Sequence, residues 1–237
     1  MPVLLAATAL PLSWGLGACT SKEVSAAKDA AAHSLSFDVL PLGLAAVPMT
    51  KPATFTEAKA ALGKELFFDK RLSSNGAMSC ESCHMHDKAW TDGIRFSTKV
   101  DGSKNTRNSP TLYNVGYHEK LYWDGRAPSL EANIAAAWKG HMGGAEAVVT
   151  ALNKVKGYQS DIQKAFGGPA TMDNVPEALA HFVRTLRAGN SAADRQKLDA
   201  DAKAGQALFM GKAKCVVCHT PPLFVDRNFQ SVGLRPD

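Results

Sequence analysis

The residues with the clearest chemistry are two copies of the pattern Cys-x-x-Cys-His, at positions 80–84 and 215–219. This spacing is typical of c-type haem attachment, because both thiols must reach one porphyrin edge while the adjacent imidazole turns under its face to bind the iron. Two matches in 237 residues predict two covalently bound haem c groups. The predicted haem-binding residues are Cys80, Cys83 and His84 for the first haem and Cys215, Cys218 and His219 for the second.

A zinc site is the alternative explanation for paired Cys-x-x-Cys sequences, since four thiolates can hold one tetrahedral ion. Both cysteine pairs are followed directly by a histidine, which a four-thiolate zinc site does not require. The sequence therefore favours haem over zinc at both positions.

The fifth cysteine, Cys19, ends an apolar stretch at residues 1–18 that resembles a bacterial lipoprotein signal peptide. We expect cleavage before Cys19 and a lipid on its sulfur, which would anchor the chain to the outer membrane. The alternative is an ordinary cleaved signal peptide in which Cys19 has no role. Both interpretations place the protein in the periplasm, where bacterial c-type haem is attached, and neither leaves a cysteine pair for a disulfide.

Residues 19–51 are rich in Ala, Ser and Pro and are predicted to form a linker. The rest of the chain is long enough for two small domains. A repeat supports this division, since GKELF at 63–67 precedes the first haem motif and GQALF at 205–209 precedes the second. In cytochrome c folds a small residue and an aromatic residue at this spacing let one helix cross another closely, so Gly63 and Gly205 are predicted to be packing residues.

Hydrophobic periodicity indicates helices and no alternating strands. The predicted helices span residues 55–68, 129–139, 145–155 and 201–210, with another beginning at a cap on Asp173 and stopping at Gly189. We expect an all-α protein with long loops around its cofactors and two cytochrome c-like domains. These domains are predicted at residues 52–195 and, as the start of the second, at 196–237.

The formal net charge of +5 and the isoelectric point of about 8.9 are mild. The chain has no run of Lys and Arg and no basic patch interleaved with aromatic residues, so nucleic acid is not an expected partner. The charge indicates a solvated surface with at most a weak bias toward acidic partners.

The order of several short sequences resembles the bacterial di-haem cytochrome c peroxidase family, which also includes MauG-like enzymes. The resemblance spans roughly residues 55–233 and contains both haem motifs. The other matching sequences are LFFDKRLS at 66–73, WTDG at 90–93, RNSPTLYN at 107–114, YWDGR at 122–126 and RTL at 184–186.

The resemblance implies roles for four residues. His84 would be the proximal ligand of the haem at which peroxide reacts, and His219 that of the haem that accepts electrons from a donor. Trp123 matches a tryptophan between the haems that would relay electrons, although packing between domains is an equal alternative. Asn108 matches a position that binds a calcium ion between the domains, and a loop-capping amide is its alternative.

His141 stands where the family usually has a glutamate before Met-Gly, an acid that moves a proton between the two peroxide oxygens. Three roles stay open for His141: the same proton transfer, an iron ligand that closes the site, or a half-exposed loop residue. His86 is expected at the surface or near a haem propionate. The absence of histidine between His86 and His118 predicts a peroxide site that needs no reductive activation.

The end of the sequence also departs from the family. Only 18 residues follow His219, and no methionine follows Met210 to serve as a distal iron ligand. We therefore expect a chain that lacks the remainder of its second domain, including that ligand. A natural protein with an open second haem is the alternative.

The leading functional prediction is a peroxidase that reduces hydrogen peroxide to water with electrons from a small periplasmic protein, either a cytochrome c or a cupredoxin. One alternative is a MauG-like di-haem oxidase that modifies a partner protein. The other is a non-enzymatic di-haem electron carrier, which a His141–iron bond would favour. A homodimer stays open.

Overall fold

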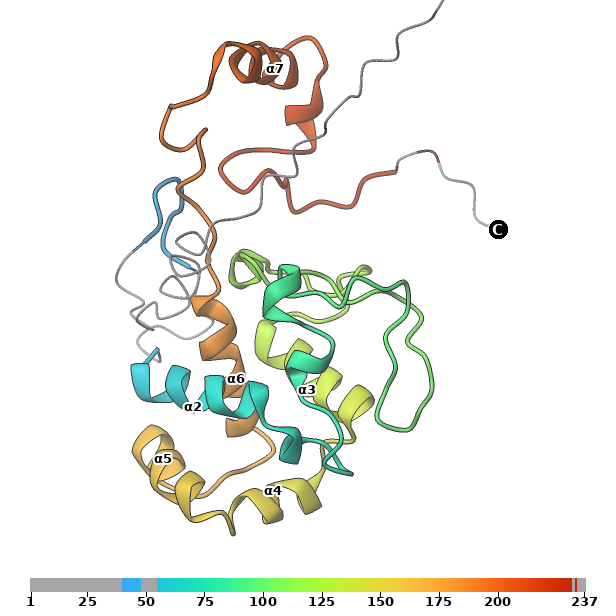
Figure 1. Ribbon diagram of the computed structural model, residues 1–237, viewed down its shortest axis with the longest axis vertical. Helices are drawn as coiled ribbons and strands as arrows, with labels where there is room; N and C mark the ends of the chain where they lie inside the picture. Colours follow the sequence, from blue (N-terminus) through green and yellow to red (C-terminus); the bar gives the residue numbers. More distant parts are fainter. Residues whose placement is uncertain (1–39, 48–54, 232, 234–237) are drawn as a thin grey trace, which may run out of the picture. The chain divides into compact units, whose positions relative to one another are not determined.

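The computed structural model describes residues 40–47, 55–231 and 233, and shows helices joined by long loops (Figure 1). The described residues form no β-strand; isolated bridges such as Met85–Thr91 and Leu121–Ala127 only close loops. The all-α prediction is confirmed. The expected signal peptide, Cys19 and most of the expected linker lie outside the described residues. No helix in the described part is long and apolar enough to cross a membrane.

The described residues form six α-helices, and single turns of 3₁₀ helix lie between several of them. The α-helices are α2 (Glu57–Phe68), α3 (Leu130–Met142), α4 (Glu146–Leu152), α5 (Lys156–Phe166), α6 (Asn174–Thr185) and α7 (Ala200–Met210). The 3₁₀ turns are η1 (Lys70–Leu72), η2 (Cys80–Ser82), η3 (His86–Lys88), η4 (Val115–Tyr117) and η5 (Cys215–Val217).

Side-chain caps start several of these helices where the sequence predicts them. Ser129 Oγ accepts a hydrogen bond from the backbone N–H of Ala132 at 3.1 Å and begins α3. Asp173 is the N-cap residue of α6, as predicted, but its side chain makes no capping hydrogen bond. Instead Thr171 and Asn174 each accept a hydrogen bond from the other's backbone N–H, at 3.1 and 2.7 Å.

The helix predicted at residues 145–155 is shorter than expected and is followed by one that was not predicted. The chain leaves the helix after Leu152, and α5 begins at Lys156. Asn153 explains the break, since its amide bonds both the N–H and the carbonyl of Ala170, at 2.8 and 3.1 Å. This long-range contact turns the chain between α4 and α5.

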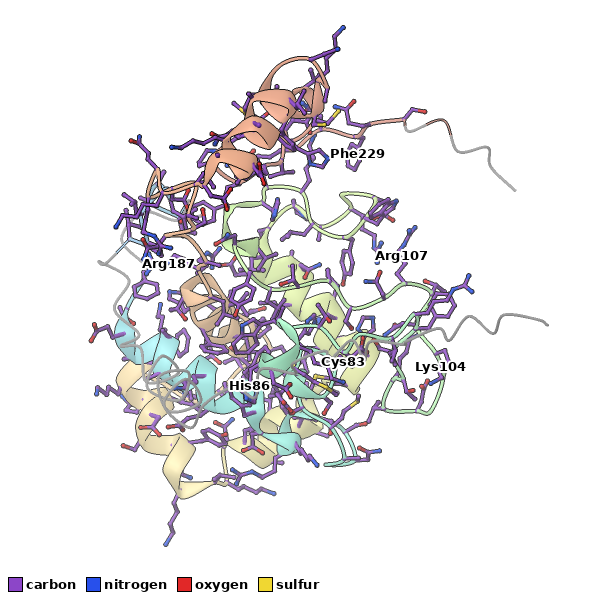
Figure 2. The ribbon with its side chains drawn as sticks, turned by 45° about the horizontal axis from the view of Figure 1, so that its top comes forward. Cys83, His86, Lys104, Arg107, Arg187 and Phe229 are labelled. Carbon is purple, nitrogen blue, oxygen red and sulfur yellow. The ribbon has the colours of Figure 1, made fainter. Side chains whose placement is uncertain are left out.

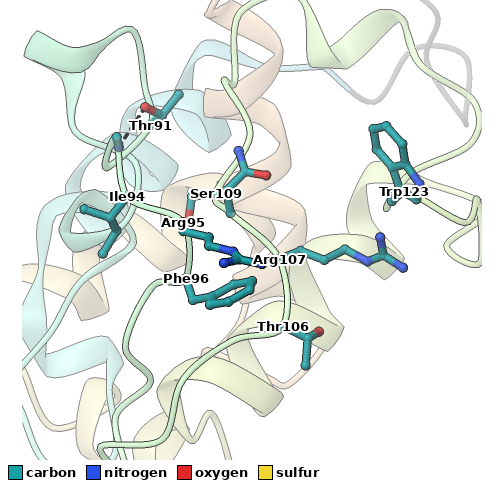
Figure 3. Close-up of a pocket in the computed structure, with 10 residues that line it drawn as sticks. Thr91, Ile94, Arg95, Phe96, Thr106, Arg107, Ser109 and Trp123 are labelled. Carbon is teal, nitrogen blue, oxygen red and sulfur yellow. Dashed lines mark hydrogen bonds between the residues drawn. The ribbon is translucent and has the colours of Figure 1, made fainter. Parts of the chain in front are cut away.

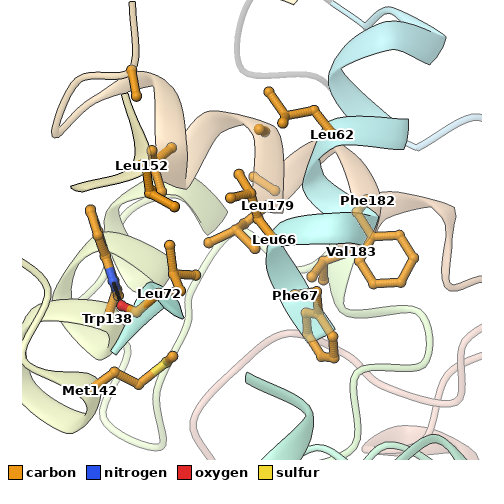
Figure 4. Close-up of a cluster of buried hydrophobic side chains, with 14 of the residues drawn as sticks. Leu62, Leu66, Phe67, Leu72, Trp138, Met142, Leu152, Leu179, Phe182 and Val183 are labelled. Atoms are coloured by element: carbon orange, nitrogen blue, oxygen red, sulfur yellow. Dashed lines mark hydrogen bonds between the residues drawn. The ribbon is translucent and has the colours of Figure 1, made fainter. Parts of the chain in front are cut away.

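The core forms where α2 crosses α6 (Figure 4). A Cβ atom placed on Gly63 would lie 1.9 Å from the carbonyl oxygen of Ala178, so only glycine permits this approach of the two helices. The prediction that Gly63 is a packing residue is confirmed. Large side chains around the crossing are almost fully buried: Leu66, Phe67, Leu72, Trp138, Leu152, Leu179, Phe182 and Val183.

A buried ion pair ties α3 to α6. Arg184 is 2% exposed, and its guanidinium donates two hydrogen bonds to the carboxylate of Glu131, at 2.5 and 3.2 Å. A two-pronged arginine–carboxylate contact fixes orientation as well as distance. Because Glu131 lies in the first turn of α3, the pair sets where that helix begins.

Helix α7 precedes the second haem motif, which begins with the turn η5. No residue of α7 is buried, and a Cβ atom on Gly205 would meet nothing within 4 Å among the described residues. The close helix crossing predicted at Gly205 is therefore not formed within the described part of the chain.

The crossing at Gly63 gives a direct test. We expect Gly63→Ala to lower the free energy of unfolding by about 1–3 kcal/mol or more, because the backbone of α6 must move away. Gly157→Ala is the matched control: Gly157 is an exposed helical glycine whose Cβ would meet nothing within 4 Å. That variant should gain up to about 1 kcal/mol from helix propensity. Urea unfolding followed by circular dichroism measures both, and equal effects would refute the tight crossing.

Candidate functional site

The first haem motif is folded into a tight turn. The backbone N–H groups of Cys83 and His84 both donate to the carbonyl of Cys80, at 3.2 and 3.0 Å. Residues three apart in a 3₁₀ turn lie above one another, so this turn presents the thiols of Cys80 and Cys83 on one face. That is the arrangement which attachment to neighbouring positions on one porphyrin edge requires.

The imidazole of His84 is held in the form that binds a metal. Its Nδ1 lies 3.0 Å from the carbonyl oxygen of Trp90, and a carbonyl can only accept, so Nδ1 carries the proton. The other ring nitrogen, Nε2, therefore keeps its lone pair for iron. Burial lowers the pKa of His84, which the Trp90 hydrogen bond opposes, and the neutral form is the one that ligates.

The second haem motif repeats this geometry. The N–H groups of Cys218 and His219 donate to the carbonyl of Cys215 at 3.2 and 2.9 Å. The Nδ1 atom of His219 lies 3.1 Å from the carbonyl oxygen of Phe224. The side chains of both motifs thus suit haem c in the same way, although His219 is exposed and His84 is half-buried.

The four described cysteines are free thiols. Burial raises the pKa of Cys80 to about 12. The pKa of Cys83 is raised by burial and then by the negative charge of Asp92. Among the residues that the structure describes, no group of three or more His, Cys, Asp or Glu side chains is arranged to hold a metal ion.

A buried carboxylate network lies against Cys83. Asp92 is 6% exposed and accepts hydrogen bonds from Ser97 Oγ at 2.5 Å and from the N–H of Ile94 at 3.2 Å. Ser97 Oγ lies 2.8 Å from Ser109 Oγ, and both hydroxyls interact with the Cys83 thiol. Sequence periodicity gave no sign of this network, because its members come from three separate loop positions.

His141 lies close to the first haem motif. It occupies the last turn of α3, which ends at Gly143 with a positive φ of 70°. The N–H of Val100 donates to the carbonyl of His141 at 2.8 Å, and the sulfur of the next residue, Met142, lies 3.8 Å from Cys80 Sγ. The structure therefore brings the end of α3, which carries His141, to the predicted thioether residue Cys80.

The surroundings of His141 favour its neutral form. Burial lowers the pKa of its imidazole, and the positive charges of Lys99 and Arg126 lower it further. A neutral imidazole can accept a proton or bind a metal, so both active roles predicted for His141 remain chemically open. Lys99 and Arg126 were not singled out from the sequence.

A pocket of about 720 Å³ is lined by two of the residues that the sequence singled out, Asn108 and Trp123. Figure 3 shows the side chains of Arg95, Arg107 and Trp123 around it. Guanidinium groups pair well with carboxylates, which are the charged groups of a haem. Ser109 also lines the pocket and contacts Ser97 in the network at Cys83.

Two predicted residues lie at the surface. Trp123 is 79% exposed, so it is not a core residue of the described structure. His86 is also exposed, as expected for a surface residue, with its Nδ1 atom 3.6 Å from a carboxylate oxygen of Glu81 (Figure 2).

Comparisons with known proteins agree with these features. A family model described as di-haem cytochrome c peroxidase matches residues 57–203. The methylamine utilization protein MauG of Methylorubrum extorquens is 40% identical over 80% of this chain and 57% of its own. The cytochrome-c peroxidase IdrP1 of Denitromonas iodatirespirans is 36% identical over 90% of this chain and 60% of its own.

Solved structures show the same fold. A MauG-like protein associated with microbial copper homeostasis superposes with a TM-score of 0.67 and 29% identity, over 83% of this chain and 61% of that one. The diheme peroxidase BthA from Burkholderia thailandensis gives a TM-score of 0.60 at 24% identity, over 79% and 59%. The chain thus spans about three fifths of the length of the relatives it matches.

The network at Cys83 can be tested by comparing two aspartates that each accept from a nearby serine. Asp92→Ala should lower the free energy of unfolding by about 1–3 kcal/mol, because it leaves buried hydrogen-bond donors unpaired. Asp101 accepts from the N–H and hydroxyl of Ser103 at an exposed turn. Asp101→Ala should therefore change the unfolding free energy by only a few tenths of a kcal/mol. A larger loss in Asp101→Ala than in Asp92→Ala, by urea unfolding, would contradict this assignment.

Proposed function

Because the chain belongs to the di-haem cytochrome c peroxidase family, we propose that it carries two covalent haem c groups and reduces hydrogen peroxide to water. The single observation that carries the proposal is the geometry at His84. Its Nδ1 proton is bound by a carbonyl while the segment ending in His141 packs on Cys80. One face of a haem at this motif would meet His84, and His141 is the neighbouring group able to move a proton.

In the proposed reaction, different side chains of the protein have different roles. Nε2 of His84 would hold the haem iron, which would supply the redox chemistry. The neutral imidazole of His141 takes the proton from one oxygen of hydrogen peroxide and delivers it to the other, which leaves as water. Arg95 and Arg107 are placed to pair with carboxylates of the haem. The overall reaction consumes one peroxide, two electrons and two protons and yields two waters.

The electrons come from outside the peroxide site. We place their entry at the haem bound by His219, from a small periplasmic donor that is a cytochrome c or a cupredoxin. Trp123 is the relay in this proposal, and its exposed indole beside the pocket supports that role. A relative that is named a cytochrome-c peroxidase supports the same class of reaction.

A MauG-like oxidase that modifies a partner protein is the second candidate. It is favoured by the 40% identity to a MauG and by the fold shared with a MauG-like protein. In that case an exposed Trp123 would exchange electrons with the partner protein. The third candidate, an electron carrier without catalysis, requires His141 to be an iron ligand.

Export to the periplasm belongs to the same proposal, since covalent haem attachment takes place there in bacteria. A lipid on Cys19, calcium at Asn108 and a homodimer are further parts of it that the described residues do not test. The pocket at Asn108 also contains two arginines, and the described residues supply no cluster of acidic ligands for a cation.

The role of His141 is tested by mixing the haem-loaded protein with stoichiometric hydrogen peroxide and following haem absorbance by stopped flow. We expect His141→Ala to slow the reaction by about 10²–10⁴-fold, as loss of a proton-transfer group does. His86→Ala, which removes an exposed histidine, is the matched control and should react like the parent. An inert parent protein whose His141→Ala variant reacts would make His141 a blocking ligand and favour the electron carrier.

The lowered pKa of His141 predicts a pH dependence. The neutral imidazole persists below the ordinary value of 6.5, so the peroxide rate should stay flat through pH 6.5 and fall only below the lowered pKa. Folding stability should fall as the pH drops from 6.5 to the lowered pKa, because over that range the unfolded state binds the proton and the folded state does not. Lys99→Gln should move the midpoint toward 6.5, whereas Lys104→Gln, at an exposed residue, should not. Coincident pH profiles for both variants would contradict this account.

A further inference from the structure

The two carbonyl groups that face the proximal histidines belong to residues with an unusual backbone. Trp90, which accepts from His84, has a φ of 62°, and Phe224, which accepts from His219, has a φ of 56°. Bulky residues seldom adopt the left-handed region. Such a conformation is strained and persists only when surrounding contacts enforce it.

The two loops are built from the same short sequence. Trp90 is followed by Thr91 and Asp92, and Phe224 is followed by Val225 and Asp226, so each loop reads aromatic-x-Asp. Each aspartate accepts from the N–H two residues later, at 3.2 Å for Asp92 and 3.0 Å for Asp226. This local bond fixes the chain directly after the left-handed residue.

An aromatic side chain from the preceding helix meets each of these rings. The rings of Phe67 in α2 and Trp90 are 5.7 Å apart at 77°. Those of Phe209 in α7 and Phe224 are 5.9 Å apart at 74°. Edge-to-face pairs of this kind are favourable beyond simple burial, so each contact offsets part of the cost of the strained backbone.

Phe67 and Phe209 are the matching residues of the repeat that precedes the two haem motifs. The repeat therefore contains a connected set: a helix phenylalanine, an aromatic residue in the left-handed region, its carbonyl and the imidazole. Burial in the core does not by itself explain the contact between Phe209 and Phe224, because Phe224 is 44% exposed.

We infer that Trp90 and Phe224 are positioning residues: each aromatic ring, held by the helix phenylalanine, keeps its strained carbonyl on Nδ1 of the proximal histidine. The hydrogen bond fixes the tautomer and raises the basicity of Nε2. A more basic ligand stabilises the oxidised iron, so each ring would tune the reduction potential of its own haem. The inference rests on the haem attachment of the proposed function and does not depend on peroxide reduction.

The test uses the haem-loaded protein, with the reduction potential of each haem measured by spectroelectrochemical titration. Trp90→Ala should shift the redox equilibrium constant of the first haem about tenfold, or about 59 mV, toward the reduced form. The carbonyl of Pro110 also interacts with His84 and remains in the variant, so a smaller shift in this direction also fits. Phe224→Ala should raise the potential of the second haem and leave the first unchanged.

Matched variants separate positioning from general stability. Trp90→Phe copies the residue of the second loop and should keep the parent potential. Trp90→Gly removes the ring but adopts the left-handed region without strain, so its potential should shift less than in Trp90→Ala and its loss of unfolding free energy should be smaller. If Trp90→Ala fails to fold, Phe67→Leu, which removes the edge-to-face contact, should shift the first haem in the same direction.

Two results would overturn the inference. One is an unchanged first potential in Trp90→Ala and Phe67→Leu despite lower stability, which would make the ring a plain packing group. The other is an equal shift of both haems in each single variant, which would show a global effect. A protein without peroxidase activity that still shows the two local shifts would refute the proposed reaction alone.

Discussion

The arrangement of the haem motifs depends on one hydrogen-bond requirement. An imidazole that binds iron through Nε2 must give its Nδ1 proton to an acceptor, and for His84 that acceptor is the carbonyl of Trp90. To reach it, the chain must turn back within six residues and hold Trp90 in the left-handed region. The ring of Phe67 steadies that turn, so the geometry of the motif depends on the position of α2.

The position of α2 is set in turn by its crossing with α6. Gly63 allows the two backbones to approach, and the leucines on either side close the core around that point. From α6 the buried pair of Arg184 and Glu131 fixes the start of α3. The far end of α3 carries His141 to the first haem motif. One close helix crossing therefore places the groups of the site that come from α2 and α3.

Charge is distributed unequally around the first motif. Asp92, a buried carboxylate, lies near Cys83. Burial is the larger cause of the raised pKa of the Cys83 thiol, and the negative charge of Asp92 raises that pKa further. Around His141 the charged neighbours are cations, among them Lys99 and Arg126, and they help to keep the imidazole neutral. The protein thus places its negative charge beside the attachment residues and leaves a neutral histidine, able to accept a proton, at the end of α3.

Local sequence alone determined the features that depend on a few neighbouring residues: both Cys-x-x-Cys-His turns, the helix start at Ser129 and the family pattern. It also identified Gly63 as a packing residue, although the same repeat marks Gly205, where no close crossing forms among the described residues. Only the tertiary structure decided the rest. The break after Leu152, the burial of Asp92 and the contact of the His141 segment with Cys80 depend on residues far apart in the chain. Their energies come from burial and long-range hydrogen bonds, which no short stretch of sequence contains.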